Sequence, residues 1–232
     1  MQVSACMLAF YWNKRRAGER KAVMARPKKD STAPRAKDRM IDAFWRALET
    51  YRIDEVTVSM ITSGADCNRG SFYYHFNSIQ ELAHAAFDRD CVNRDDVARA
   101  ILAFVSGKHV EATRAIFDEE RVKKMGLIGV CGGAAVAGGG TCDALNSVWL
   151  AIACAAGEPC TAGARSAIDF INYGIARFVN TACEVSPEDS NVDESAVFLR
   201  DLADFALQEI ERFQHISDEE AIARLKQLVE SA

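Results

Sequence analysis

Hydrophobic residues recur along most of this chain at intervals of three and four, the spacing of a helix face. No run alternates apolar and polar residues between hairpin-type turns, as a half-buried strand would. The clearest stretches predict helices over residues 35–51, 164–183 and 194–213. Shorter amphipathic stretches lie at 95–107, 109–124 and 218–229. All four prolines fall outside these stretches, at 27, 34, 159 and 187. The pattern therefore predicts an all-α fold.

Residues 57–76 differ from the long stretches, because they divide into two short helices joined by a tight turn. Thr57 is a favourable N-cap for the first short helix, and Asn68 is one for the second. Between them, Asp66 is one of the few non-glycine residues that tolerate the positive φ of a sharp turn. The residues expected to face inward are Val58, Ile61, Ala65, Phe72 and Phe76.

The outward face of the second short helix carries hydrogen-bonding side chains, namely Arg69, Ser71, Tyr73 and Tyr74. Such a helix is suited to the major groove of DNA, where base edges present donors and acceptors. After it, Ser78 and Glu81 have the spacing of a capping box that begins a further helix. Together with the helix over 35–51, these elements predict a three-helix helix-turn-helix unit.

This region resembles the DNA-binding domain of the tetracycline-repressor (TetR) family over residues 35–87. The family's run is roughly Thr-Val-x-x-Ile-Ala-x-x-Ala-Gly-Val-Ser-x-Gly-Thr-Leu-Tyr-x-His-Phe, followed by x-Ser-Lys-Glu-Glu-Leu. Without a gap, the chain matches it at Thr57, Val58, Ile61, Ala65, Gly70, Tyr73, His75, Phe76, Ser78, Glu81 and Leu82. It departs at the turn, which reads Asp66-Cys67-Asn68 instead of Gly-Val-Ser. It also departs at Ile79, where the family's lysine commonly binds a phosphate.

The resemblance implies DNA contacts at Thr57, Ser59, Asn68, Arg69, Gly70, Ser71, Tyr73, Tyr74 and His75. Thr57 and Tyr73 are expected on phosphates. The expected base-edge readers are Arg69, Ser71 and Tyr74, and an arginine is suited to guanine. His75 is expected to touch a phosphate or to bridge to the next helix. The alternative for the two tyrosines and the histidine is an aromatic packing cluster, and for Arg69 it is a solvent-exposed arginine.

The net charge of −5 is unevenly distributed. Residues 14–39 contain eleven Lys or Arg and three Asp or Glu, a net charge of +8, which leaves −13 for the rest. A basic arm joined to an acidic body suits a DNA-binding protein, although a solvated tail has the same composition. We expect residues 1–34 to be a disordered basic arm. Met24-Ala-Arg-Pro-Lys-Lys29 resembles the start of many TetR-family members, so Met24 is a second candidate start besides Met1. Residues 1–23 belong to the native protein only if translation starts at Met1.

A chain of 232 residues can hold two domains, which we place at 35–94 (helix-turn-helix) and 95–232 (helical effector-binding and dimerisation domain). Residues 5–12 are apolar but short, and positive charges follow them, unlike in a secretory signal. The eight cysteines lack Cys-x-x-Cys spacing and the four histidines lack His-x-x-x-His spacing, so no metal site is predicted. We therefore expect reduced thiols, no cofactor, no membrane association and a cytoplasmic protein.

The late helices are candidates for dimerisation. Apolar residues cover too wide an arc of 194–213 for one packing surface, so this helix is expected to have partners on two sides. The TetR resemblance implies a four-helix bundle between two protomers, with an interface at Ile171, Ile175, Phe178, Leu202, Phe205 and Ile210. Candidate lining residues of an apolar effector pocket are Phe104, Phe117, Trp149, Phe170 and Tyr173, although core packing explains each of them equally well.

Residues 126–142 contain seven glycines and no charged residue. They carry neither the Gly-Lys-Ser/Thr of a Walker loop nor a Gly-x-Gly-x-x-Gly motif, and they are too short and too glycine-rich for a persuasive membrane span. Three interpretations stay open: a flexible loop, a helix packed closely through its small residues, and a wall of the effector pocket.

The sequence predicts a DNA-binding transcriptional regulator, specifically a homodimeric repressor that an unidentified small-molecule effector releases from a double-stranded DNA operator. One alternative is the same fold with thiol oxidation in place of a ligand. The other is an enzyme that holds a nucleotide on the glycine-rich segment. The enzyme is disfavoured, because that segment has no phosphate-binding lysine and no nucleophile, base and acid can be identified by spacing.

Overall fold

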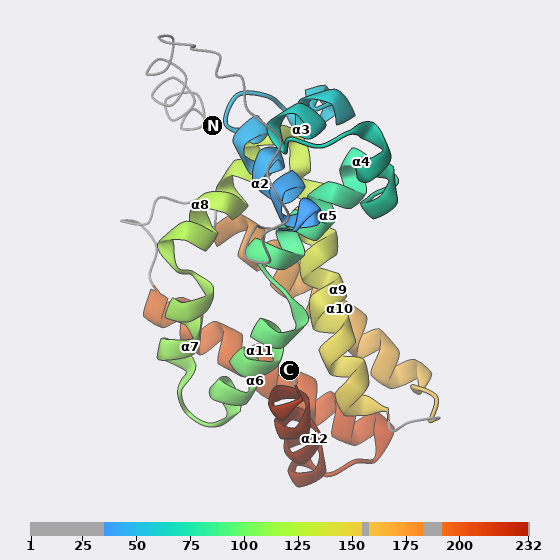
Figure 1. Cartoon of the computed structure of the whole chain (residues 1–232). Coiled ribbons are helices and arrows are strands. Elements are labelled where there is room, and N and C mark those ends of the chain that lie inside the picture. Colours follow the sequence, from blue (N-terminus) through green and yellow to red (C-terminus); the bar gives the residue numbers. More distant parts are fainter. Residues whose placement is uncertain (1–34, 155–157, 183–191, 232) are drawn as a thin grey trace. The chain divides into compact units, whose positions relative to one another are not determined.

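The structure, a computed structural model, describes residues 35–154, 158–182 and 192–231. Within these ranges every regular element is a helix, which confirms the predicted all-α fold (Figure 1). The predicted basic arm at residues 1–34, with both start positions, lies outside the described residues.

Five elements form the first part of the described chain: α2 (Ala36–Leu48), the 3-10 turn η1 (Ile53–Glu55), α3 (Val58–Gly64), α4 (Arg69–His75) and α5 (Ile79–Asp90). Their apolar faces meet in one core, whose fully buried members include Met40, Phe44, Ile61, Phe72 and Leu82. Burial of each such side chain contributes about 1.5–3 kcal/mol. Isolated seven-residue helices are unstable in water, so α3 and α4 depend on their packing against α2 and against each other.

Side-chain caps fix where the next helices begin. Ser78 Oγ accepts a hydrogen bond from Glu81 N (3.1 Å), as predicted. The Glu81 carboxylate accepts from Asn77 N (2.7 Å), one residue before the expected position, and this hydrogen bond lowers the pKa of Glu81. Asn93 Oδ1 accepts from Asp96 N (2.9 Å), so a new helix begins directly after the end of α5.

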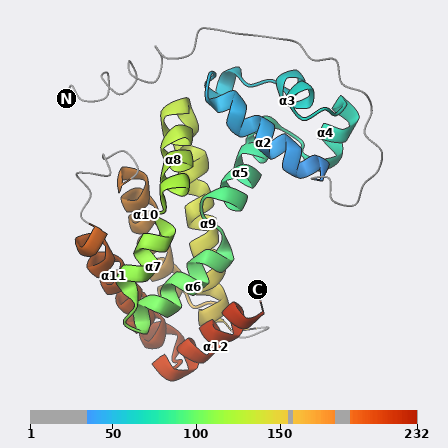
Figure 2. The ribbon, with the colours of Figure 1, turned by 60° about the vertical axis from the view of Figure 1, so that its left-hand side comes forward.

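The remaining helices form the body: α6 (Arg94–Val105), α7 (His109–Ile116), α8 (Glu119–Ile128), the π-helical turn η2 (Gly129–Gly133), α9 (Ala134–Ala153), α10 (Ala162–Ala182), α11 (Val192–Gln214) and α12 (Asp218–Glu230). α10 packs against both α9 and α11, and α12 packs against α6 and α9. Figure 2 shows α5 running from the short helices into this body, where it contacts α8 and α9. The helix-turn-helix is thus anchored to the body through α5.

Two helix boundaries differ from the prediction. The stretch 109–124 is two helices, because Phe117 leaves the helical conformation (φ −99°, ψ 41°) and Asp118 caps a new helix. Asp118 Oδ1 accepts from Arg121 N (3.0 Å). α2 ends at Leu48, so Tyr51 lies beyond the helix with 45% of its surface exposed instead of on the buried face.

The glycine-rich segment 126–142 is a closely packed helical region and not a flexible loop. It comprises the end of α8, η2 and the start of α9. Gly132 has a φ of 88°, a conformation that interrupts the helix inside η2 and favours glycine. Gly140 lies against Phe87, and a Cβ at this position would stand 2.6 Å from the ring. The small residues therefore allow α9 to approach α5 closely.

One helical stretch, Glu119–Ala153, is long and apolar enough to cross a membrane by length and composition alone. Its α9 portion packs against α5, α6, α10 and α12. A core helix of a soluble protein has the same properties, so the stretch is only a weak indication of a membrane span.

Candidate DNA-binding surface and internal pocket

The turn between α3 and α4 is fixed by local hydrogen bonds. Thr57 Oγ1 accepts from Met60 N (3.3 Å), and Asn68 Oδ1 accepts from Ser71 N (2.8 Å), which confirms both predicted N-caps. Asp66 occupies the left-handed region with a φ of 49°, as the turn requires. These interactions set the angle at which α4 leaves α3.

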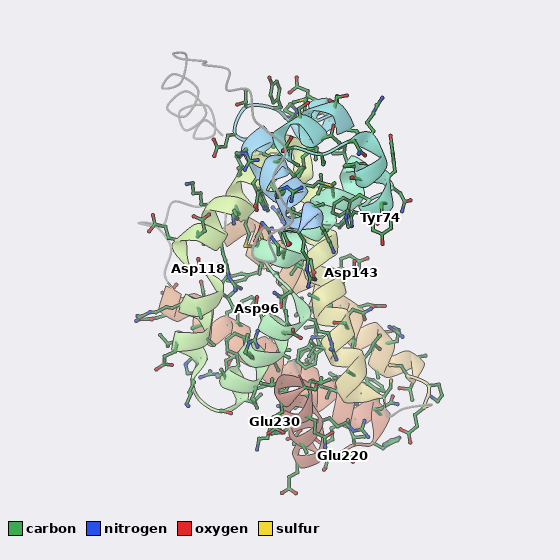
Figure 3. All side chains as sticks on the ribbon, in the orientation of Figure 1. Tyr74, Asp96, Asp118, Asp143, Glu220 and Glu230 are labelled. Atoms are coloured by element: carbon green, nitrogen blue, oxygen red, sulfur yellow. The ribbon has the colours of Figure 1, made fainter. Side chains whose placement is uncertain are left out.

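The two phenylalanines of this region hold α4 against the core. Phe72 is fully buried, Phe76 is 2% exposed, and their ring centroids are 5.8 Å apart. With this face inward, Tyr73 and Tyr74 point outward with 56% and 83% of their surfaces exposed. Figure 3 shows Tyr74 projecting from α4 away from the other helices. The outward face of α4 is therefore available to a partner.

All nine residues predicted to contact DNA come from the start of α3 and from α4 with its cap. Seven are exposed and two, Ser71 and His75, are half-buried. The His75 ring lies 4.9 Å from the Tyr74 ring and 6.3 Å from the Phe76 ring. The aromatic cluster considered from the sequence is thus present at His75, while Tyr74 keeps most of its surface in solvent.

Two arginines that sequence reasoning did not assign support the turn from α2. Arg39 Nε donates to Ala65 O (3.0 Å), and Arg46 donates to Gly64 O (2.9 Å). Both carbonyls belong to the C-terminal end of α3, where helix carbonyls lack intrahelical partners and the helix dipole favours a cation. The sequence signal for this role was the presence of two basic residues, Arg39 and Arg46, on the helix before the turn.

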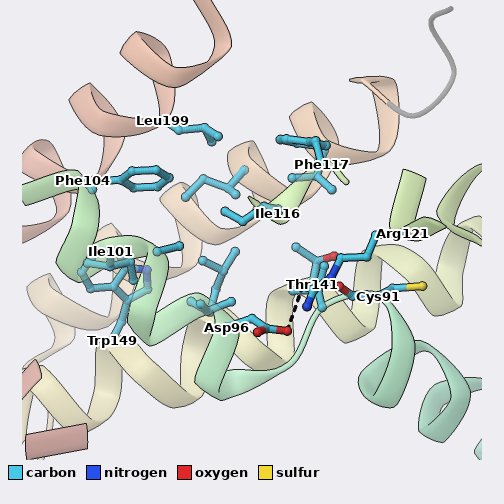
Figure 4. A pocket seen from close by; sticks show the side chains of 17 residues that line it. Cys91, Asp96, Ile101, Phe104, Ile116, Phe117, Arg121, Thr141, Trp149 and Leu199 are labelled. Atoms are coloured by element: carbon cyan, nitrogen blue, oxygen red, sulfur yellow. Dashed lines mark hydrogen bonds and ion pairs between the residues drawn. The ribbon is translucent and has the colours of Figure 1, made fainter. Parts of the chain in front are cut away.

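A pocket that is partly open to solvent lies among the helices of the body (Figure 4). It is lined by Cys91, Val92, Asp96, Val97, Ala100, Ile101, Phe104, Ile116, Phe117, Arg121, Thr141, Leu145, Trp149, Ile175, Val179, Leu199 and Ala203. Three of the five predicted lining residues, Phe104, Phe117 and Trp149, are among them. The other two, Phe170 and Tyr173, are 75% and 73% exposed on α10 and do not line this pocket.

The charged and hydroxyl side chains of the pocket lining have hydrogen-bond partners, whereas one polar group has none. Arg121 donates to Asp96 (2.9 Å) and to Cys91 O (3.3 Å), and Asn93 Nδ2 also donates to Asp96 (2.9 Å). The Thr141 hydroxyl donates to Ala137 O (2.9 Å). Trp149 is fully buried, and its Nε1 has no hydrogen-bond partner among the described residues.

The six residues predicted at a dimer interface divide between the interior and the surface. Ile171, Ile175 and Ile210 are buried within the chain, whereas Phe178 and Leu202 are half-buried and Phe205 is 42% exposed. Several other large apolar side chains of α10 and α11 are also exposed: Phe170, Tyr173, Val197 and Phe198. The Phe178 and Phe198 rings pack at 5.1 Å. We name the exposed Phe170, Tyr173, Val197, Phe198 and Phe205, together with the half-buried Phe178, the α10–α11 aromatic face.

Burial makes several cysteine thiols of the described chain less reactive. Burial raises the pKa of the thiols of Cys131 and Cys142, which disfavours the reactive thiolate. Burial also raises the pKa of Cys160, and the neighbouring Cys154 thiol raises it further. The described residues contain no group of three His, Cys, Asp or Glu side chains that could hold a metal ion.

The family model described as bacterial regulatory proteins, tetR family, matches residues 41–86, which extend from α2 to α5. Neither curated proteins nor solved structures match the chain. The matched region contains the capped turn and the outward face of α4, so the comparison agrees with the geometry of the helix-turn-helix. The description of this family is that of regulatory proteins. The chain therefore carries, over residues 41–86, the helix-turn-helix domain of the tetR family, a DNA-binding domain of transcriptional regulators.

Proposed function

We propose that this regulator is a cytoplasmic homodimer that represses transcription and leaves its operator when a small, mostly apolar effector enters the internal pocket. The observation that carries the proposal is the pocket itself, since a pocket lined almost entirely by apolar side chains with few polar groups is typical of a small-molecule site. Cys91, directly after α5, lines it. Because α5 also belongs to the helix-turn-helix, one helix joins the pocket to the DNA-binding surface.

On DNA, α4 acts as the recognition helix in the major groove. Thr57 and Tyr73 contact phosphates of the DNA. Ser59, Asn68 and Gly70 approach the sugar-phosphate backbone beside these phosphates. The exposed side chains of Arg69 and Tyr74, with Ser71, read base edges. His75 packs between two rings, which suits a positioning role for the neighbouring tyrosines.

Dimerisation pairs the α10–α11 aromatic face of one protomer with that of its partner. Large exposed apolar areas are uncommon on monomeric proteins, which supports a covered surface here. Phe178, Leu202 and Phe205 contribute to it directly, whereas the buried Ile171, Ile175 and Ile210 hold α10 and α11 in place from within. A twofold axis would set two copies of α4 on the halves of a near-palindromic operator.

Release follows from the contacts that the pocket shares with the DNA-binding helices. Arg121 of α8 lines the pocket and donates to Cys91 O at the end of α5. An effector that prefers a different placement of α5 or α8 would change the separation of the two recognition helices. Its effect on operator affinity is limited to its differential affinity for the two arrangements.

Footprinting of the purified protein on fragments of its own genome tests the proposal. We expect a protected, near-palindromic site whose halves are about one helical turn or more apart. The double variant Arg69→Ala/Tyr74→Ala should lose protection, whereas Gln80→Ala, exposed on α5 outside the assigned surface, should keep it. If the purified protein protects no site, the proposed operator binding is wrong, and the proposed repression with it.

The contact between Cys154 and Cys160 keeps thiol control as a second candidate. In that case two-electron oxidation by a peroxide would join the two sulfurs, reduce the peroxide to water or alcohol, and lower operator affinity. The variant Cys154→Ser/Cys160→Ser would keep its affinity in peroxide. Equal operator affinity of the unaltered protein before and after peroxide would exclude this candidate.

A further inference from the structure

We infer that the pocket takes an uncharged, largely hydrocarbon molecule with one hydrogen-bond-accepting oxygen, such as a ketone, and that Trp149 donates to this oxygen. The inference rests on the proposed effector role of the pocket and specifies the chemistry of the molecule that fits it. Its starting point is a buried donor without an acceptor.

Trp149 lies on α9 with none of its surface exposed, and its Nε1 has no partner among the described residues. A buried indole N–H normally finds an acceptor, because burial without one is unfavourable. Figure 4 shows Trp149 together with Ile101 and Phe104 at one end of the pocket, with its nitrogen on the edge toward the other lining side chains. The unpartnered donor therefore belongs to a side chain of the pocket wall, at the end formed with Ile101 and Phe104.

A water molecule is a poor substitute for such an oxygen. Buried water typically makes two to four hydrogen bonds to the protein. Thr141 precedes Trp149 by eight residues on α9, a distance of about 12 Å along the helix axis at about 1.5 Å per residue. Asp96 and Arg121 lie near Thr141 at the same far end (Figure 4). The labelled lining side chains beside Trp149 are those of Ile101 and Phe104, so a water there would have the indole as its only polar side-chain partner among them.

The far end of the pocket argues against a charged effector. Asp96 is paired with Arg121 (2.9 Å), which also donates to Cys91 O. Because these two side chains already satisfy each other, neither offers a counter-charge for a carboxylate or an amine. A charge that enters an apolar cavity without a partner loses its hydration uncompensated. A neutral molecule avoids this cost.

The test uses three probes on one ten-carbon ring skeleton: tetralin, 1-tetralone and tetralin-1-carboxylate. Calorimetric titration of the full-length protein should give 1-tetralone about tenfold tighter binding than tetralin, as one net hydrogen bond implies. The carboxylate should bind more weakly than either. In Trp149→Phe, which keeps an aromatic ring but removes the donor, 1-tetralone should lose its advantage while tetralin binds as before. Phe104→Leu, a change at the same end of the pocket, should weaken both neutral probes by a similar factor and keep their ratio.

Equal affinities of tetralin and 1-tetralone for the unaltered protein would overturn the inference, as would tightest binding by the carboxylate or no binding of any probe. These comparisons need no variant, so they decide the point even if Trp149→Phe does not fold. An advantage of 1-tetralone that persists in a folded Trp149→Phe would overturn the assignment of Trp149. Operator binding by the ligand-free protein, measured by fluorescence anisotropy on the same preparation, judges the proposed DNA-binding role separately.

Discussion

Among single residues, Tyr73 best separates a contact with DNA from a contribution to packing. Its ring edge meets Phe72 at 5.4 Å, while 56% of the residue is exposed. Tyr73→Phe keeps the ring and removes the hydroxyl, so it should weaken operator binding by about tenfold or less, the value of one hydrogen bond. The melting temperature should not change. Tyr51→Phe, at an exposed tyrosine outside α3 and α4, is the control. Unchanged operator affinity in Tyr73→Phe would remove this hydroxyl from the DNA contacts.

Asp66 offers a test of backbone conformation in the turn. Its φ of 49° is unfavourable for a residue with a Cβ, although aspartate tolerates it better than most. Asp66→Gly should therefore raise the free energy of unfolding by up to about 1 kcal/mol, and Asp66→Ala should lower it. Urea unfolding of the three proteins measures the order. Greater stability of the alanine variant than of the glycine variant would contradict this account of the turn.

At the residue scale, the predictable features were those set by neighbours in sequence. The caps at Thr57 and Asn68 and the turn at Asp66 depend on hydrogen bonds within three residues, so the local residue types indicate them. The unpartnered Nε1 of Trp149 has no such signature. It arises because helices distant in sequence enclose the indole without bringing an acceptor to it.

At the scale of helices, α2, α5 and α8 are joined by a cluster around Asp90. Its carboxylate accepts from Trp45 Nε1 (2.6 Å) and from Arg89 (2.7 Å), and Lys124 lies 3.7 Å away. The Lys124 ammonium also lies 5.7 Å from the centre of the Trp45 ring. Lys124 follows the pocket residue Arg121 by one turn of α8. α8 therefore contacts the pocket and the helix-turn-helix at adjacent turns.

Asp90→Asn tests whether this cluster holds the three helices together. The amide keeps the size of the side chain but removes the charge that Arg89 and Lys124 face, so we expect a loss of about 1–3 kcal/mol in the free energy of unfolding. Asp54→Asn is the matched control, because Asp54 is 76% exposed and pairs with Arg52 at 3.4 Å. That change should stay within about 0.5 kcal/mol. Equal stability of the two variants would show that the cluster contributes little to the junction.

Helix periodicity predicted which segments are helical better than it predicted which face is inside. α10 has apolar residues on both sides: Ile171 and Ile175 are buried, whereas Phe170 and Tyr173 are exposed. A repeat of three and four identifies an apolar arc, but tertiary packing decides which part of that arc meets the core. This explains why Ile175 lines the pocket while Phe170 and Tyr173 face solvent. The break at Phe117 was missed for a related reason, since Asp118 is a good cap in a stretch whose periodicity continues across it.

At the scale of the whole molecule, operator recognition depends on two copies of α4 held at a fixed separation. One recognition helix contacts a single half-site, whereas a dimer gains affinity because its second contact is intramolecular. The α10–α11 aromatic face is the candidate for holding the copies together. Phe198 belongs to this face with 46% of its surface exposed, and its ring packs against Phe178.

Phe198→Glu should separate the protomers without unfolding them. A partly exposed carboxylate is tolerated in a monomer, but in a twofold interface each protomer would bury one against the partner's apolar face. Sedimentation should show a monomer, and operator affinity should fall by about a hundredfold or more as avidity is lost. Val130→Glu, at an apolar residue of η2 that is 60% exposed, supplies the same change of charge away from this face and should stay dimeric. If Phe198→Glu sediments as a dimer and binds its operator with full affinity, the two protomers must meet elsewhere, because a buried pair of carboxylates would not leave both properties unchanged.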